Sequence, residues 1–248
     1  MESAEWQKQL GRELFGADFE FAHFPVKDSG RRGLLGYTAD ITPSLVFSAY
    51  LQGIFPWYNE DEGDPVLWWC PDPRFVLPVD ELHIPHSIDR FLKHTPYTYT
   101  MDKAFSDVIK GCASMKRPGQ EGTWIGRQML DVYKNLAARG IAHSVEVWHN
   151  GRLAGGLYGI LVGQVFCGES MFTVENNSSK SAFVLFSRAF KKCGGRLIDS
   201  QVYTDNIARY GAHNISRTAF LHMESQLLAG TLCRNLRETF EESANTLI

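Results

Sequence analysis

The stretch HSVEVWHNGRLAGGLYGILVGQVFCGESMF, residues 143–172, decides the fold class that the sequence predicts. Its apolar residues alternate or run together from Val145 to Phe166, a pattern that is typical of β-strands. The letters HNGR at 149–152 have the composition of a hairpin turn, and Gly163 marks a second break. The stretch therefore predicts three consecutive strands in an antiparallel meander.

Helices and one further strand are predicted on the carboxyl side of this meander. Residues 177–195, NSSKSAFVLFSRAFKKCGG, carry an apolar stripe that ends at Gly194, which is typical of a capped helix. RLIDSQV at 196–202 predicts a short strand, and helices are expected over 205–212 and 216–230. This order resembles the core of the acetyltransferase-like (GNAT-like) fold, so the expected class is α+β, with an antiparallel sheet and flanking helices.

The part before the meander predicts a small amino-terminal α/β domain, residues 1–75, ahead of an acetyltransferase-like catalytic domain at 76–248. Within the small domain, a helix over 43–52 has Thr42 as its cap and Gly53 as its stop signal. Further helices are predicted at 85–94, with Ser87 as the cap, at 101–113 and at 126–140.

An aromatic loop follows the first of these helices. GIFPWYNEDEGDPVLWWCPDPR, residues 53–74, holds three tryptophans and four prolines in 22 residues. Proline restricts the backbone and large rings bury much area, so the loop is either a stiff cap over a core or a preformed aromatic wall of a ligand site. The pattern alone favours the cap.

Composition narrows the class of protein. The chain has 248 residues, 44% of them hydrophobic and 21% charged, which predicts an ordered globular protein, and it contains no apolar run of 18 residues, so we expect it in the cytoplasm. Five widely spaced cysteines predict reduced thiols, and His83 and His86 have no second ligand pair, so no metal site is expected. A net charge of -3 argues against a protein that coats nucleic acid.

Eight motifs resemble a known family. They are GIFPW, VLWWCPDPR, EGTWIGR, HSVEVW, FCGESMF, SSK, LIDSQV and GAHNISR, in this order between about Phe24 and Leu228. In composition and spacing they resemble the leucyl/phenylalanyl-tRNA–protein transferases. Because the motifs are long and in register, the resemblance is specific.

The resemblance implies an aminoacyltransferase. Its donor would be Leu or Phe, with Met as a third candidate, carried by aminoacyl-tRNA, and its acceptor a protein or peptide with amino-terminal Lys or Arg. The product would be a degradation signal of the N-end rule type. The resemblance implies no metal and no organic cofactor, and we expect a monomer with no membrane partner.

The resemblance also assigns roles within the chain. Asp199 and Gln201 are two apart in LIDSQV, and we expect them on one face of a strand, where Asp199 polarises a Gln201 that accepts a hydrogen bond from the attacking amine. Glu169 would bind the donor's α-ammonium group. The donor pocket would comprise Trp57, Trp124, Tyr133, Leu157, Phe166, Met171 and Phe186. Trp68 and Trp69 would pack behind Trp57, and Leu157 stands where a methionine is expected.

Contacts to tRNA are expected from Arg74, Arg90 and Lys93, and Lys116, Arg117 and Arg127 are further basic candidates. His86 and His94 replace arginines that the family leads us to expect. Asn206 and Arg209 stand in place of a histidine and a serine, which puts local acceptor or tRNA contacts in doubt.

Two other classes of function remain as alternatives. An acyl-CoA-dependent N-acetyltransferase would suit the meander, but its pyrophosphate loop is absent, since RLAGGL at 152–157 fails at Leu157. A noncatalytic RNA- or peptide-binding module would explain the aromatic and basic residues but assigns no role to Glu169 and Gln201 together.

Overall fold

The computed structural model describes residues 2–26, 30–115 and 123–246. Its main sheet has the strand order β10-β4-β9-β8-β7-β6-β5. Every neighbouring pair is antiparallel except β8 and β9, which are parallel. The strands are β4 (Arg74–Pro78), β5 (Thr98–Met101), β6 (Ala142–His149), β7 (Arg152–Val162), β8 (Val165–Thr173), β9 (Leu197–Asp199) and β10 (His213–Ile215). The chain therefore has a mixed α/β fold.

The predicted meander is confirmed as β6, β7 and β8. Its register pairs Val145 with Leu157 and Leu157 with Met171, so these three side chains share one face of the sheet. Tyr158, the next residue of β7, belongs to the apolar cluster on the opposite face. The alternation of β7 therefore sends one set of residues toward each layer of helices.

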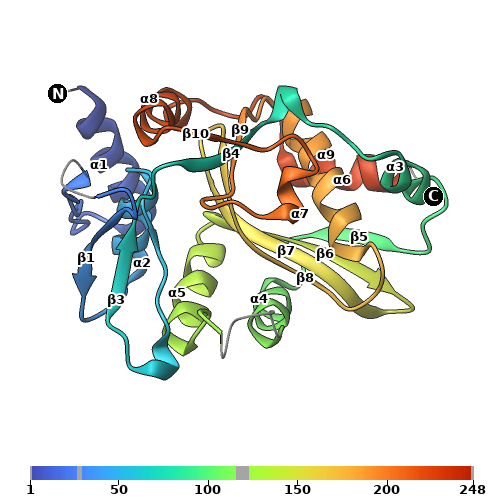
Figure 1. Cartoon of the computed structure of the whole chain (residues 1–248), viewed down its shortest axis with the longest axis horizontal. Coiled ribbons are helices and arrows are strands. Elements are labelled where there is room, and N and C mark those ends of the chain that lie inside the picture. Colours follow the sequence, from blue (N-terminus) through green and yellow to red (C-terminus); the bar gives the residue numbers. More distant parts are fainter. Residues whose placement is uncertain (1, 27–29, 116–122, 247–248) are drawn as a thin grey trace.

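Helices cover both faces of the meander (Figure 1). On one side lie α6 (Ser178–Lys192), which joins β8 to its parallel neighbour β9, and α9 (Leu236–Asn245). On the other side lie α4 (Phe105–Ser114) and α5 (Arg127–Ala138). Phe166, Phe186 and Phe190 are central to the first core, and Met129, Tyr133 and Ile160 belong to the second.

A second, smaller sheet has the order β1-β3-β2. Its strands are β1 (Leu34–Thr38), β2 (Phe55–Pro56) and β3 (Val66–Trp69), and it lies with α1 (Glu2–Phe15) and α2 (Pro43–Tyr50) at the left of Figure 1. Phe47 and Trp68 belong to the same apolar cluster as Tyr133 and Ile160. The small sheet and the α5 side of the main sheet therefore share one core.

Several predicted boundaries differ from the structure. The helix α3 (His86–Leu92) has Pro85 at its cap position, so the prediction that Ser87 caps it was wrong. The predicted strand 196–202 is ordered only as β9, Leu197–Asp199, because the chain then enters a tight turn at Gln201. The helices predicted over 205–212 and 216–230 are α7 (Asp205–Ala208) and α8 (Arg217–Leu228). Between them β10 pairs with β4, a contact that local pattern could not indicate.

Within the described residues, no helix is long and apolar enough to cross a membrane.

Candidate active site

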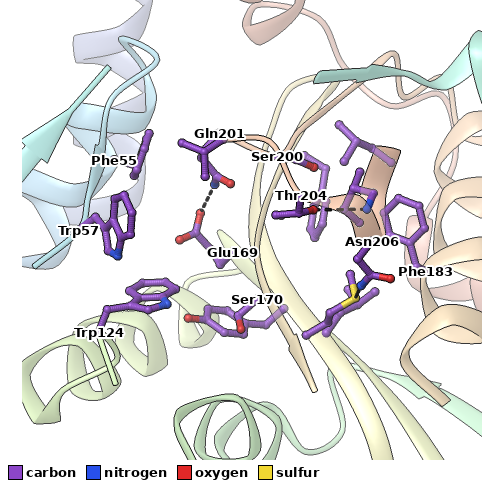
Figure 2. Close-up of a pocket in the computed structure, with 18 of the residues that line it drawn as sticks. Phe55, Trp57, Trp124, Glu169, Ser170, Phe183, Ser200, Gln201, Thr204 and Asn206 are labelled. Atoms are coloured by element: carbon purple, nitrogen blue, oxygen red, sulfur yellow. Dashed lines mark hydrogen bonds between the residues drawn. The ribbon is translucent and has the colours of Figure 1, made fainter. Parts of the chain in front are cut away.

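A cavity of about 370 Å³ opens between the small sheet, the carboxyl half of β8 and the turn after β9. Figure 2 shows Trp57 and Trp124 on one side of it and Phe183, Thr204 and Asn206 on the other, with Glu169 and Gln201 between the two groups. Of the residues that the family resemblance singles out, the cavity is lined by Trp57, Trp124, Leu157, Phe166, Glu169, Met171 and Gln201. Long-range folding therefore brings together four of the eight motifs and Leu157.

Trp57 is held at the mouth of the cavity by its neighbour Trp69. The Trp69 indole Nε1 donates to the Trp57 carbonyl oxygen at 2.7 Å, and the ring centroids lie 6.0 Å apart. Trp68 is 1% exposed in the core, whereas Trp57 remains 39% exposed. Trp57 is thus a partly exposed ring held by Trp69, whereas Trp68 lies in the core and packs on Phe24 with ring centroids 5.1 Å apart.

The apolar part of the cavity is built on the meander and α6. Leu157, Phe166 and Met171 come from β7 and β8, and Phe183 comes from α6. Phe186, expected on the wall, is instead fully buried behind it and packs on Phe166 with ring centroids 4.3 Å apart. Phe186 therefore supports the wall rather than forming it.

Glu169 is the centre of a hydrogen-bond network. Its Oε1 accepts from the Tyr50 hydroxyl at 2.6 Å, and its Oε2 accepts from the Tyr133 hydroxyl at 3.1 Å. The two hydroxyl oxygens lie 2.8 Å apart. Tyr133, expected on the pocket wall, is thus a buried partner of Glu169, and Tyr50 from α2 is a site residue that the sequence did not indicate.

When Glu169 is ionised, the three contacts among Glu169, Tyr50 and Tyr133 have one hydrogen too few for three hydrogen bonds. Each hydroxyl supplies one hydrogen, so two hydrogens serve three contacts, whereas a protonated Glu169 supplies a third. Burial raises the pKa of Glu169 to about 7, against the two tyrosine hydrogen bonds, which lower it. Burial, with the Glu169 charge adding to it, also raises the pKa of Tyr50 and Tyr133, so both remain donors. An ammonium group would supply hydrogens that an ionised Glu169 lacks.

Gln201 enters the cavity from a tight turn. Its φ is 55°, a left-handed conformation that costs a non-glycine residue on the order of 1–3 kcal/mol. Its side-chain Nε2 donates to Glu169 Oε1 at 3.0 Å. With its NH₂ group on Glu169, the carboxamide keeps its carbonyl oxygen as an acceptor.

Asp199 does not share a face with Gln201 in the way that their spacing predicts. The strand ends at Asp199, and the turn rotates Gln201 into the cavity while Asp199, 0% exposed, is not among the described residues that line it. Asp199 accepts from the Gln201 backbone N at 3.0 Å and from Arg74 at 2.8 and 2.6 Å. Asp199 thus contacts the backbone of Gln201 instead of its carboxamide.

Arg74 is 1% exposed and both its Nε and Nη2 donate to Asp199. A guanidinium in this position cannot reach a phosphate at the surface, so the expectation that Arg74 contacts tRNA was wrong. Arg90 lies exposed on α3 and Lys93 is exposed directly after its end, where it pairs with Asp89 at 3.2 Å. Arg127 is exposed at the start of α5, and Lys116 and Arg117 lie outside the described residues.

Asn206 contributes to the cavity, and Arg209 lies exposed after α7. The Asn206 Nδ2 donates to the Met171 sulfur at 3.1 Å, which places a polar group against the apolar wall. Asn206, one of the two residues here that differ from the family pattern, therefore forms part of the cavity lining. In the parts of the chain that the structure describes, no three His, Cys, Asp or Glu side chains are grouped as metal ligands.

An apolar cavity that presents a carboxylate and a carboxamide side by side is typical of an enzyme site for a small ligand that has both an apolar and a cationic part.

Comparison with known proteins identifies the family. The model described as leucyl/phenylalanyl-tRNA protein transferase matches residues 76–225, and the model of the N-terminal domain of the same family matches residues 39–72. Proteins named leucyl/phenylalanyl-tRNA–protein transferase from Yersinia pestis and Yersinia pseudotuberculosis are 50% identical over 195 residues, which cover 79% of this chain and 80% of theirs. The chain belongs to the leucyl/phenylalanyl-tRNA–protein transferase family.

Similarity to solved structures is weak. The structure of L-PGS from Bacillus licheniformis aligns with a TM-score of 0.38 and 12% identity over 71% of this chain and 65% of that one. The C-terminal domain of a putative lysylphosphatidylglycerol synthetase from Agrobacterium fabrum aligns with a TM-score of 0.39 and 10% identity over 98% and 74%. Scores this low carry no argument about the site.

Proposed function

We propose that this chain transfers Leu or Phe, with Met as a third donor, from aminoacyl-tRNA to the amino terminus of proteins that begin with Lys or Arg, which creates a degradation signal. Membership of the family supports aminoacyl-tRNA as donor and a protein amino terminus as acceptor. The observation that carries the proposal is the hydrogen bond of 3.0 Å between Gln201 and Glu169 at the wall of an apolar cavity.

The donor amino acid would occupy the cavity. Its ammonium group would bind Glu169, and its side chain would lie against Leu157, Phe166 and Met171. Trp57 and Trp124 would flank the ester at the mouth of the cavity. A single methylene group is worth only about 1–3 kcal/mol in such a pocket, so we expect a preference among Leu, Phe and Met rather than strict selection.

The reaction needs little beyond correct placement, because an aminoacyl ester is already activated. The acceptor nitrogen forms a bond to the ester carbonyl carbon, the bond to the terminal ribose oxygen breaks, and one proton passes overall from the nitrogen to that oxygen. The Gln201 carbonyl oxygen would accept a hydrogen bond from the attacking amine and direct its lone pair at the carbonyl carbon. Gln201 has no useful pKa, so it orients the amine and does not keep its proton.

The body of the tRNA would be held by phosphate contacts. Arg90 and Lys93 are the candidates, since both are exposed at the carboxyl end of one short helix, α3. The negative net charge of the chain, -3, implies that such contacts are few.

The architecture proposed for this function is a GNAT-like domain preceded by a small amino-terminal domain, in a monomeric cytoplasmic enzyme. The meander and the crossover through α6 to the parallel strand β9 support the first part. We move the division between the domains from residue 75 to the loop before β4, because β4 begins at Arg74 and belongs to the main sheet.

The test is transfer of labelled Leu, Phe or Met from charged tRNA to peptides that begin with Arg, Lys, Asp or Glu. We expect transfer to the Arg and Lys peptides. Transfer from acetyl-CoA to the same peptides, without transfer from charged tRNA, would identify an N-acetyltransferase and overturn the proposal. Binding of tRNA without any transfer would identify a noncatalytic module.

A further inference from the structure

Arg74 and Asp199 form a buried ion pair beneath the floor of the cavity. Arg74 Nε lies 2.8 Å from Asp199 Oδ1, and Arg74 Nη2 lies 2.6 Å from Asp199 Oδ2. The exposed fractions of the two residues are 1% and 0%. Two parallel hydrogen bonds to one carboxylate fix its position and its plane, which a single charge contact cannot do.

The same carboxylate holds the turn that carries Gln201. Asp199 Oδ1 also accepts from the Gln201 backbone N at 3.0 Å. The Val202 N donates to the Ser200 carbonyl oxygen at 2.6 Å, so Gln201 is the central residue of a three-residue turn with a φ of 55°. Turns of this kind are strained and persist only where their surroundings hold them.

The turn is also tied to the strand on which Arg74 lies. Phe75 N donates to the Gln201 carbonyl oxygen at 3.2 Å, and Ser200 N donates to the Phe75 carbonyl oxygen at 3.0 Å. Phe75 is the residue directly after Arg74 in β4. The ion pair and these two backbone bonds therefore hold the turn from the same strand.

The side chains around Arg74 leave Asp199 as its ion-pair partner. The guanidinium carbon lies 4.9 Å from the Phe55 ring centroid and 4.4 Å from the Phe220 ring centroid, so two aromatic faces enclose it. Its Nη1 has no hydrogen-bond partner in the described parts of the chain. Glu224 is also buried, and its Oε1 has no hydrogen-bond partner in the described residues; burial and the Asp199 charge raise the pKa of Glu224, and the Arg74 charge lowers it.

We propose that Arg74 is a positioning residue for the reaction: through Asp199 it holds the strained turn that directs the Gln201 carboxamide to Glu169 and to the attacking amine. This inference rests on the proposed function. Arg74 touches no substrate, and its effect reaches the cavity along one chain of hydrogen bonds, from Arg74 to Asp199, to the Gln201 backbone, and from the Gln201 side chain to Glu169.

Arg74→Lys tests the geometry of this chain while it keeps the charge. A lysine contacts the carboxylate at one point, so Asp199 can rotate and the turn can shift. A displacement of about 1 Å at a reacting group can cost on the order of 100-fold in rate, so we expect kcat to fall by about 10- to 100-fold. The KM for aminoacyl-tRNA should not change. Arg188→Lys is the matched control, because Arg188 pairs with Asp89 at 2.8 Å between α6 and α3, away from the turn.

A second measurement reads the turn directly. The side-chain NH₂ signal of Gln201, assigned by its loss in Gln201→Ala, should shift in Arg74→Lys and in Asp199→Asn and stay in place in Arg188→Lys. The double variant Arg74→Lys with Asp199→Asn should lose no more activity than the more affected single variant, since both act through one turn. Additive losses would show that Arg74 acts on the reaction by another route and would overturn the inference.

The remaining outcomes also decide whether Arg74 holds the turn at Gln201. An Arg74→Lys protein with wild-type kcat and an unmoved Gln201 signal would also overturn the inference. If Arg74→Lys does not fold, Asp199→Asn, which keeps the size of the side chain, carries the same test of the turn. If the wild-type chain transfers no amino acid, the proposed function fails, while the Gln201 signal still decides whether Arg74 holds the turn.

Discussion

Replacing Glu169 by Gln is the sharpest test of the donor anchor. The substitution keeps the size of the side chain and one acceptor oxygen, and its NH₂ group can donate to the other tyrosine hydroxyl, but it removes the negative charge that would face the donor ammonium. A hydrogen bond to a charged partner contributes about 1.5–3 kcal/mol, so the dissociation constant of the donor should rise by between about 10-fold and about 150-fold.

The change of donor affinity with pH has a predicted direction. Only ionised Glu169 attracts an ammonium group, and with a pKa of about 7 it is about one-tenth ionised at pH 6 and about nine-tenths ionised at pH 8. The donor ammonium loses its proton near pH 8. Donor affinity should therefore be highest between these values and fall on both sides. Glu169→Gln should abolish the rise between pH 6 and pH 7 and also flatten the fall at high pH, because both depend on the carboxylate charge.

The assay is the affinity of a short tRNA 3′-end analogue in which Phe is joined by a stable amide bond, measured from pH 5.5 to pH 9. The same analogue with an acetylated amine is the control, and its affinity should respond neither to pH nor to Glu169→Gln. If wild type and Glu169→Gln bind the free-amine analogue equally at every pH, Glu169 is not the ammonium anchor, and an ammonium group does not supply the hydrogen that ionised Glu169 and its two tyrosine partners lack.

Three further predictions concern catalysis, binding and stability. Gln201→Ala should lower kcat at least about 100-fold and leave the affinity for uncharged tRNA unchanged, since the carboxamide acts on the attacking amine; an equal loss of tRNA affinity would contradict this. Trp57→Ala should lower activity with Leu and Phe at every salt concentration, whereas Arg90→Ala with Lys93→Ala should weaken tRNA binding and reduce the slope of log affinity against log salt by about two; an unchanged slope would place the tRNA path elsewhere. Folding raises the pKa of Glu169, so this group stabilises the folded protein below pH 4, and the stabilisation is lost as the pH rises to about 7. In urea unfolding, Glu169→Gln should reduce this fall in the free energy of unfolding by up to about 3 kcal/mol. Parallel plots of unfolding free energy against pH for the two proteins would contradict the prediction.

The sequence determined the parts of this protein that depend on local periodicity and on long motifs. The meander follows from a period of two between Val145 and Phe166, because strand neighbours joined by short turns pair without help from distant residues. The family, and with it the aromatic and acidic groups that line the cavity, follows from motifs in the sequence. Trp57, Glu169 and Gln201 are all predicted as site residues by these motifs alone.

The tertiary structure alone decided what those residues contact. Arg74 and Asp199 are separated by 125 positions, and Tyr50 and Glu169 by 119, so no local pattern could pair them. Arg74 is a basic residue from which a tRNA contact is expected, and only the antiparallel pairing of β4 with β9 places it in the interior. The prediction that Asp199 and Gln201 share one face was wrong because a spacing of two places side chains on one face only while the strand continues, and β9 ends at Asp199. A backbone turn at Gln201 is stable only because Asp199, Arg74 and Phe75 hold it, and those contacts exist only once the sheet has assembled.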